Sequence, residues 1–561
     1  MCSMSQRARW FSSAGLAGAT VIVLRLVASN GRSDYAIWPD EPAQLAIARF
    51  VGGGTRWDMH NHSVWRPLYG TLLSPVYWFT DDPTTVFATA LVLNAILGGV
   101  AAILLVVLAR RLTALGSWWC ALLAVLASAS PALLFTTDFV FSESLLVVLY
   151  LATLLALLRF QRAPTLAMGV VAGVLAGAAF GTHSRMLPLG IIVVGAAAVA
   201  SYQRRLAARD GLAVGLVAFA SLYAMSVYTS YLVDRLWNEP STRNSIDGVL
   251  GQFGNIPAIL VSLFGQSWSL LVSTLGIIAY GLVVVVRNAR PATDGHDRDG
   301  PSVNDARIVL VSFLACAGLS VVFMSDRWRS DQLVYGRYNA AVVAPLLIVG
   351  MATLMGSIRT RRFALMVAVA AVATVASGAV IWMWRRSELS ESNGLAPMIL
   401  GLQPFITSET RIDVVRITAW ATGIIVLLGA GSIALHQHAR RRKAVLVAVV
   451  GALVVTGSLR THHTIDRLWN VSDDFRAVEA LQGDVLIDNV DYFLPAGSNS
   501  TTALMRYQFH LPHITFTIVS DPLAGASAPY VFAPIDQADV AGSGARLVWR
   551  DPRTDIGLWQ R

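Results

Sequence analysis

Residues 84–108 read TTVFATALVLNAILGGVAAILLVVL, and Arg110-Arg111 follows almost at once. The run contains no charged residue and is long enough to cross a hydrocarbon core of about 30 Å as an α-helix. Comparable apolar runs recur from Ser12 almost to Arg460. Because a bilayer core accepts only helices and closed barrels, the sequence predicts an all-α polytopic membrane protein.

The composition supports this class. Of the 561 residues, 55% are hydrophobic and 14% are charged, and the mean hydropathy is +0.58. A soluble protein would have about a quarter of its residues charged. The net charge of +9 does not indicate nucleic-acid binding, because most arginines lie in short loops between apolar runs, where they set orientation.

We predict about 13 transmembrane helices, each about 16 to 26 residues long. They lie at 12–28, 84–108, 117–135, 142–158, 164–182, 186–201, 211–236, 266–286, 307–325, 339–357, 363–384, 413–435 and 444–460. A cytoplasmic N-terminus makes every cytoplasmic loop basic, with Arg110-Arg111, Arg159/Arg162, Arg204-Arg205/Arg209, Arg287/Arg290, Arg359/Arg361-Arg362 and Arg440 to Lys443. The positive-inside rule therefore predicts a multi-pass cell-membrane protein with this orientation.

Residues 461–561 differ in composition from the membrane domain, 1–460. They contain strand-like runs at 485–487, 514–519 and 546–549 and an amphipathic stretch at 473–481. About 100 residues can bury a core, so we expect a small C-terminal α/β extracytoplasmic domain. Trp549 and Trp559 suggest that this domain binds carbohydrate or acceptor.

Acidic residues gather in the extracytoplasmic loops. Asp40-Glu41 lies in the first outer loop, about 29–83, between two prolines that stiffen the backbone. Adjacent carboxylates at a membrane boundary are costly, so the pair is either a catalytic base site or a solvated loop feature. Asp138 and Glu143 lie in the second outer loop, where Glu143 could also serve as a first-turn helix residue.

Arginines are the second unusual group on this side. Arg185, Arg327, Arg329 and Arg337 lie at the outer ends of spans, and Arg66 lies within the first outer loop. Outer-face arginines are exceptions to the positive-inside rule, and several could converge on one phosphate, which guanidinium groups bind in a bidentate way. The alternative is that each reaches the lipid headgroups.

Metal binding is left open by the sequence. His60-x-His62 has the spacing of a metal-ligand pair on a strand. The carboxylates of Asp40, Glu41 and Glu143 could also hold Mg²⁺ or Mn²⁺ through oxygen ligands, although nothing in the sequence requires a cofactor.

Five segments together resemble the GT-C superfamily of integral-membrane glycosyltransferases. It includes protein O-mannosyltransferases, lipid A aminoarabinose transferases, and the arabinofuranosyl- and mannosyltransferases of actinobacterial envelopes. The segments are Asp40-Glu41 after the first span, Arg66 to Leu73 (RPLYGTLL, similar to hPPLYxxLL), Ser142 to Leu146, Gly181 to Arg185, and Arg337-Tyr338 with Ala344-Pro345. The resemblance covers about 1–360 and the plan of a C-terminal extracytoplasmic domain.

The resemblance implies transfer of a sugar from a polyprenyl-phosphate-linked donor to an envelope glycan, lipid or protein acceptor, with inversion. It implies Asp40 as general base, Glu41 and Glu143 as supporting acids, and Arg66, Arg185 and Arg337 as ligands of the lipid phosphate. The other expected substrate-binding residues are His60, His62, Tyr69, Asp138, His183 and Tyr338. Arg66 stands where the family commonly has proline, and Met186 follows Arg185, so donor sugar and subfamily stay open.

Three other functions compete with the glycosyltransferase interpretation. An envelope-precursor transporter or flippase would show mid-membrane charges, broken helices or paired repeats, and the predicted spans show almost no mid-depth charge and no repeat. A polysaccharide ligase or polymerase would share the lipid-linked donor. A non-catalytic envelope scaffold would explain 461–561 but not the acidic and basic outer loops.

Overall fold

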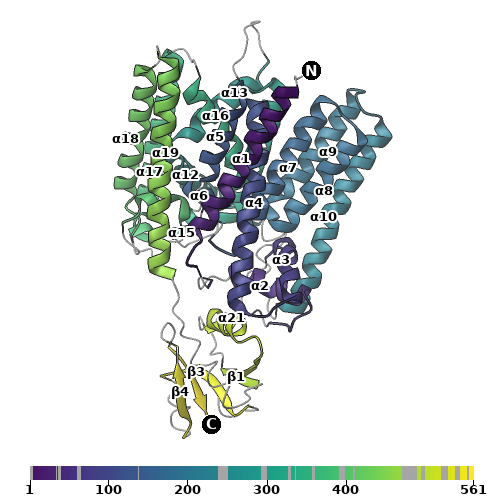
Figure 1. Cartoon of the computed structure of the whole chain (residues 1–561), viewed down its shortest axis with the longest axis vertical. Coiled ribbons are helices and arrows are strands. Elements are labelled where there is room, and N and C mark those ends of the chain that lie inside the picture. Colours follow the sequence, from purple (N-terminus) through teal and green to yellow (C-terminus); the bar gives the residue numbers. More distant parts are fainter. Residues whose placement is uncertain are drawn as a thin grey trace.

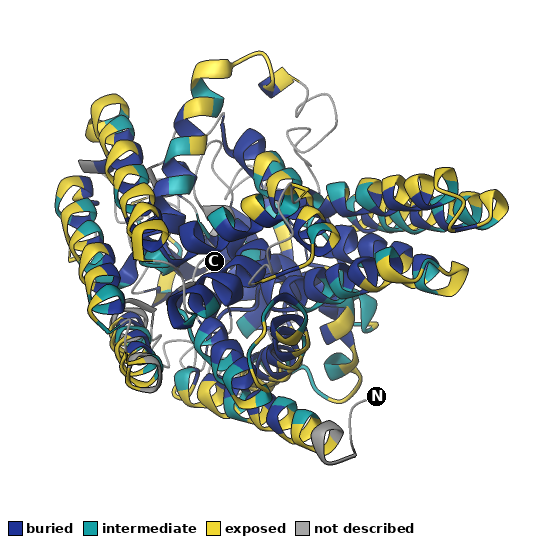
Figure 2. Ribbon diagram, turned by 90° about the horizontal axis from the view of Figure 1, so that it is seen from above, coloured by how far each residue is buried: buried dark blue, intermediate teal, exposed yellow. Residues whose placement is uncertain are grey.

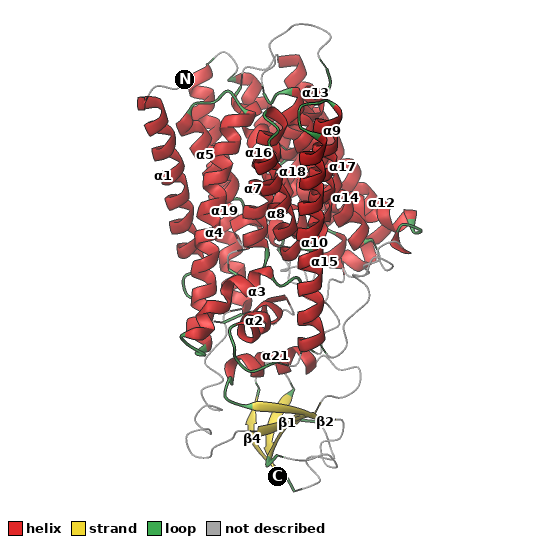
Figure 3. Cartoon of the chain, turned by 90° about the vertical axis from the view of Figure 1, so that its right-hand side faces the viewer, coloured by secondary structure: helices red, strands yellow, loops and turns green. Residues whose placement is uncertain are grey.

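The computed structural model combines a helical body with a small β-sheet beyond one of its ends (Figure 1). We name this end of the body the sheet end; the N-terminus lies at the opposite end (Figures 1 and 3). The structure describes residues 4–32, 34–35, 40–57, 59, 65–134, 136, 138–237, 251–291, 300–325, 330–334, 336–356, 360–390, 399–407, 411–435, 438–469, 489–493, 500–519, 528–536, 544–551 and 555–561.

Long apolar helices form the body. They are α1 (Met4–Ala28), α4 (Pro83–Leu112), α5 (Ser117–Ser128), α7 (Glu143–Arg162), α8 (Leu166–Thr182), α9 (Leu187–Tyr202), α10 (Ala208–Leu236), α12 (Ile256–Ser273), α13 (Ile277–Ala289), α14 (Val303–Met324), α16 (Ala340–Met355), α17 (Thr360–Ser390), α18 (Val414–Ala434) and α19 (Ala439–Trp469). Buried residues occupy the centre and exposed residues the outer faces (Figure 2). Among the described residues, 11 helices are long and apolar enough to cross a membrane, so the predicted class is confirmed but the count of 13 is not.

The predicted single span at 266–286 is wrong in one respect. The structure places a turn at Thr274–Gly276, which separates α12 from α13. Leu275 and Gly276 have φ values of 51° and 72°, and this left-handed conformation interrupts an α-helix. Hydropathy could not reveal the break, because the residues on both sides of it are equally apolar.

The first outer loop contains helices that the sequence analysis did not predict. α2 (Asp40–Val51), α3 (Leu68–Leu73) and the 3₁₀ helix η1 (Ser74–Trp78) lie at the sheet end, as do the short elements α6 (Pro131–Leu134), η3 (Ser184–Met186), α15 (Ser330–Leu333), η5 (Arg337–Asn339) and η7 (Leu400–Phe405). Asp40 and Glu41 stand in the first turn of α2. Carboxylates are favoured there by the helix dipole.

Small residues form a close contact between α8 and α10. Gly169, Gly173, Gly177 and Gly181 repeat every fourth position of α8 and face α10. A Cβ atom at Gly177 would lie 2.4 Å from Cβ of Ser221. This stripe lets the two backbones approach as small-residue interfaces do in membranes, and it places the end of α8, with His183 after it, beside α10.

An ionic triad around a buried carboxylate joins three helices at the end opposite the sheet. Asp305, in the first turn of α14, is 2.7 Å from Arg111 on α4 and 3.0 Å from Arg162 on α7. Both arginines come from loops that the sequence predicts to be cytoplasmic. Arg111 and Arg162 therefore have two expected roles: they contribute to the orientation of the helices, and they pair with a buried carboxylate.

The C-terminal sheet has five strands in the order β2-β1-β3-β5-β4. They are β1 (Asn489–Phe493), β2 (Thr515–Val519), β3 (Tyr530–Pro534), β4 (Arg546–Arg550) and β5 (Ile556–Gln560), and α21 (Ser500–His510) connects β1 to the parallel β2. β2 falls within the predicted run 514–519, and β4 covers the predicted run 546–549 and one further residue. The predicted elements at 473–481 and 485–487 lie outside the described residues.

The two tryptophans that suggested carbohydrate binding are buried. Trp549 is 9% exposed and Trp559 is 6% exposed, and both pack into hydrophobic clusters of the sheet. A small domain buries little surface, so large aromatic side chains such as these contribute much of the apolar area in its core. The expectation that these two residues contact carbohydrate is therefore wrong.

α21 docks the sheet onto α2. Phe509 packs edge-on against Tyr35, with ring centroids 5.2 Å apart. Nε2 of His510 lies 2.9 Å from a carboxylate oxygen of Asp34, and the guanidinium of Arg49 on α2 donates to the carbonyl of Pro512 at 3.1 Å. The C-terminal sheet is thus anchored on the helix that begins with Asp40.

We expect Asp34→Asn to loosen this docking at pH 7. Burial by itself raises the pKa of Asp34, but His510, Arg506 and the amide of Tyr35 together lower it below its ordinary value. Arg506 is 1% exposed, and losing the partner of a buried charge costs about 3 kcal/mol. A distance measured by electron resonance between spin labels on η1 and β4 should broaden in the variant.

The same pKa direction gives a pH dependence. A carboxyl group whose pKa is lowered by docking stabilises the docked state above its free pKa, and that contribution is lost as pH falls through the lowered value. Wild-type distances should therefore stay constant from pH 8 to about 5 and broaden below about pH 4. Asp555→Asn, on an exposed pair with Arg550, is the control. Equal distances in Asp34→Asn and wild type would contradict this role of Asp34.

Candidate active site

Asp40 and Glu41 point into different surroundings at the start of α2. The Asp40 side chain is 21% exposed, whereas Glu41 is fully buried. An oxygen of Glu41 accepts a hydrogen bond of 2.9 Å from the backbone amide of Val140. Because a carboxylate buried against a backbone amide is not accessible to substrate, we assign Glu41 to positioning. Asp40 is then the accessible acid of the pair.

Arg337 joins Asp40 to Glu143. Its Nη2 lies 2.5 Å from Oδ2 of Asp40, and its Nε lies 2.7 Å from Oε1 of Glu143. Glu143 and Arg337 are each 5% exposed, so these ion pairs form in a medium of low dielectric constant, where charges interact strongly. We name Asp40, Glu143 and Arg337 the acid–arginine cluster. Its members come from α2, α7 and η5.

Trp65 holds the second oxygen of Asp40. Its indole Nε1 donates a hydrogen bond of 2.7 Å to Oδ1, and its ring stacks against Trp237 at a centroid distance of 6.2 Å. With Arg337 on one oxygen and Trp65 on the other, the carboxylate has a single orientation. This role of Trp65 was not predicted, because tryptophans near the membrane–water interface are common and usually serve only to anchor the protein there.

The other two predicted phosphate ligands stack on aromatic rings. The guanidinium carbon of Arg185 lies 3.3 Å from the ring centroid of Tyr338. That of Arg66 lies 4.0 Å from the ring of Phe180. Burial lowers the pKa of Arg66 to about 10, so it stays cationic at pH 7, and cation–π contacts of this kind stabilise a partly dehydrated charge.

His183 shows that the three arginines share one electrostatic environment. Its imidazole packs edge-on against Tyr338, with ring centroids 5.2 Å apart. The pKa of His183 lies well below its ordinary value, because the ring is buried and because Arg185, Arg337 and Arg66 are positively charged nearby. His183 is therefore neutral at pH 7. Charges from three different segments of the chain therefore act on one imidazole, and their convergence on a single phosphate stays a prediction.

Asp138 and Tyr69 lie in a buried network beside the cluster. Asp138 is fully buried, and its charge acts on Arg25 of α1. The Tyr69 hydroxyl donates to Oδ1 of Asn94 at 2.9 Å, and the amide of Asn94 donates to the carbonyl of Phe139 at 2.8 Å. Both predicted substrate-binding residues are fully buried, and Tyr69 is linked through Asn94 to the backbone at Phe139.

Two groups that hold Arg337 were not predicted. The ring centroid of Phe141 lies 4.1 Å from the Arg337 guanidinium. Asn339, two residues after Arg337, donates a hydrogen bond of 2.7 Å to Oε1 of Gln266, and Ser320 donates to the same oxygen at 3.2 Å. In the sequence, Gln266 could have indicated this network, because a side-chain amide within an apolar run usually forms hydrogen bonds to neighbouring helices in membranes.

The remaining predictions concern histidines and metal. His60, His62, Arg327 and Arg329 lie outside the described residues. Within the described part of the chain, no group of three or more His, Cys, Asp or Glu residues is arranged to hold a metal ion. Glu41, which was one of three expected oxygen ligands for a divalent cation, instead binds the backbone of Val140.

No protein-family model matches the sequence, and no curated protein matches it. The structure is similar to ArnT from Cupriavidus metallidurans bound to undecaprenyl phosphate, with a TM-score of 0.53, 15% identity and 97% of each chain covered. For ArnT in the apo state the TM-score is 0.50, at 16% identity and the same coverage. Arabinosyltransferase EmbB from Mycobacterium smegmatis gives a TM-score of 0.47 at 15% identity, covering 83% of this chain and 42% of EmbB.

The shared architecture defines the class of fold. The likeness to ArnT extends over nearly the whole of both chains. The protein is therefore a multi-pass membrane protein with the same fold as ArnT. At this level of identity the similarity establishes the fold and not the activity.

Proposed function

We propose that the protein transfers a sugar from a polyprenyl-phosphate-linked donor to an envelope glycan, lipid or protein acceptor, on the extracytoplasmic face of the membrane. The bridge from Arg337 to Asp40 and Glu143 carries this proposal. It places an accessible carboxylate next to a guanidinium, at the end of the body that charge distribution predicts to be extracytoplasmic. ArnT, with the same fold, was crystallised with undecaprenyl phosphate.

The charges of the site suit such a donor. Asp40 and Glu143 contribute two carboxylates, and Arg66, Arg185 and Arg337 contribute three guanidinium groups, so the site has an excess of positive charge for a phosphate. His183 is neutral and therefore adds no repulsion toward the arginines. Planar guanidinium groups bind phosphate oxygens in pairs.

The reaction needs a base on one side of the sugar and an anion site on the other. Asp40 accepts the proton of an acceptor hydroxyl, whose oxygen forms a bond to the anomeric carbon of the donor sugar. The bond from that carbon to the phosphate oxygen breaks, and the electron pair leaves with polyprenyl phosphate. The arginines stabilise this leaving group, and attack opposite to it inverts the anomeric configuration.

A transporter is the second candidate, and one observation favours it. Broken helices often mark substrate sites in transporters, and α12 and α13 are interrupted at Thr274–Gly276. However, the break satisfies its own backbone, because Gly276 donates to the carbonyl of Leu271 at 2.8 Å and Thr274 donates to Leu270 at 3.1 Å. The residues of the break carry no charge, so we prefer the transferase.

The test is donor turnover by the full-length protein in proteoliposomes. Radiolabelled polyprenyl-phosphate sugars are supplied one at a time with an envelope extract as acceptor. We expect one donor to release free polyprenyl phosphate in a one-to-one ratio with sugar on the acceptor. Movement of intact donor across the bilayer without release would instead assign the protein to the transporters. If every donor tried showed neither release nor movement, the proposal would be overturned.

A further inference from the structure

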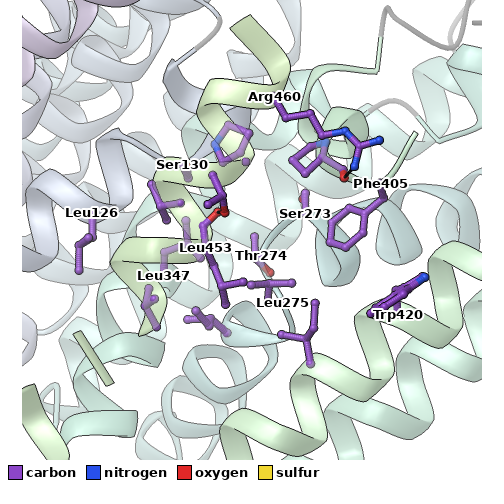
Figure 4. Close-up of a pocket in the computed structure, with 18 of the residues that line it drawn as sticks. Leu126, Ser130, Ser273, Thr274, Leu275, Leu347, Phe405, Trp420, Leu453 and Arg460 are labelled. Carbon is purple, nitrogen blue, oxygen red and sulfur yellow. Dashed lines mark hydrogen bonds between the residues drawn. The ribbon is translucent and has the colours of Figure 1, made fainter. Parts of the chain in front are cut away.

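A cavity of about 470 Å³ lies between α5, α12, α16, α18 and α19 and contains none of the residues assigned to the active site. Most of its lining is aliphatic, including Leu126, Leu347, Met351, Val450, Leu453 and Val454. Figure 4 shows Leu126, Leu347 and Leu453 on one side of the cavity, with Phe405 and Arg460 on the other. Its volume is within the usual range for ligand sites.

The interior offers little to a polar ligand. The hydroxyl groups of Ser273 and Thr274, at the break between α12 and α13, donate back to the carbonyl of Leu270 at 3.3 and 2.7 Å. Their hydrogens are therefore already used within the helix. Irregular backbone at membrane depth is tolerated where it lines a cavity, and this cavity matches a hydrocarbon chain.

Two arginines stand at one end of the cavity. Arg460, near the end of α19, donates to the carbonyls of Pro404 and Ile406 at 3.2 and 3.4 Å. Arg416, in the first turn of α18, donates to the carbonyl of Phe405 at 3.3 Å and to the hydroxyl of Thr407. Both guanidinium groups are thus held around the same three consecutive carbonyls, on the side of the protein where arginines are exceptional.

We infer that the cavity binds one anionic membrane phospholipid, with an acyl chain among the aliphatic side chains and its phosphate at Arg416 and Arg460. Charge complementarity supports this occupant, since basic pockets between transmembrane helices select anionic headgroups and guanidinium groups pair with phosphate. The lipid is distinct from the donor, whose phosphate ligands are Arg66, Arg185 and Arg337. Its binding does not require the proposed transfer reaction.

The test is native mass spectrometry of the full-length protein in detergent, titrated with phosphatidylglycerol or with phosphatidylcholine of the same chains. We expect one retained phosphatidylglycerol, with apparent affinity about 10-fold lower in Arg416→Gln/Arg460→Gln. Leu453→Trp, which fills the cavity, should also lower retention. Arg411→Gln is the matched control, because Arg411 is exposed and does not line the cavity.

Several outcomes would overturn the inference. The two arginines would have no role if wild type and the double variant retained phosphatidylglycerol equally. The same conclusion would follow if wild type retained phosphatidylcholine as well as phosphatidylglycerol. Displacement by glycerol phosphate would identify an anion site without a lipid chain. Displacement by polyprenyl phosphate would assign the cavity to the donor. Arg337→Gln should retain phosphatidylglycerol normally, so this inference and the proposed transfer reaction can fail independently.

Discussion

Replacing Asp40 with asparagine is expected to lower the rate of sugar transfer about 10²- to 10⁴-fold, the usual effect of losing a general base. Asparagine keeps the volume of the side chain and its acceptor oxygen, so the bond from Trp65 can persist. The loss should fall mainly on kcat, with the donor KM changed less, because only Arg337 of the three proposed phosphate ligands pairs with Asp40. Initial rates over a range of donor concentrations measure both.

Asp82→Asn is the control for this prediction. Asp82 is the N-cap of α4 and accepts a hydrogen bond from the amide of Thr85. Asparagine is an equally good N-cap, so this variant removes a carboxylate from the same outer loop without affecting the site. A rate for Asp40→Asn within threefold of wild type would exclude Asp40 as the base.

Arg337→Gln is expected to lower transfer about 10²- to 10³-fold, as removal of a group that stabilises developing negative charge does. It leaves Asp40 and Glu143 without the guanidinium that bridges them. Arg337→Lys should lose less activity than Arg337→Gln but should not restore the wild-type rate. An ammonium group keeps the charge, yet it lacks the planar donor set that reaches two carboxylates at once. Transfer rates of the three proteins test this order.

Loss of folding is separated from loss of activity by a double variant. Arg337→Gln leaves a buried carboxylate unpaired, which costs about 3–5 kcal/mol. Arg337→Gln/Glu143→Gln removes both buried charges, so it should recover thermal stability in detergent while staying inactive. Arg386→Gln, at an exposed position of α17, controls for the change of residue type. Recovery of activity in the double variant would show that Arg337 serves only to neutralise Glu143.

The packing of α21 gives the C-terminal sheet a direct connection to the base. α21 rests on the residues that precede α2 and on α2 itself, through Tyr35, Asp34 and Arg49. Asp40 begins that helix. We therefore expect deletion of 465–561 to reduce kcat as well as any affinity for acceptor, because it removes a support of α2.

The candidate site illustrates what can be predicted from single residues. Asp40, Glu143, Arg66, Arg185 and Arg337 were recognised because each is a charge placed at an outer membrane boundary, which has a cost that needs an explanation. Their charges were informative without a structure. Glu41 and Asp138 look equivalent to them in the sequence, yet the structure leaves neither with any exposed surface. Glu41 accepts from the amide of Val140, and Asp138 acts on Arg25.

The sequence alone determined the membrane class, and it predicts basic cytoplasmic loops and a separate C-terminal segment, because run length, loop charge and composition are local properties of a chain. Only the tertiary structure decided that residues 40, 143 and 337 meet, that Trp65 orients Asp40, and that α12 and α13 are separate helices. These features depend on which helix faces pack together across hundreds of residues. Such contacts arise from side-chain shape and close packing, which hydropathy and spacing do not encode.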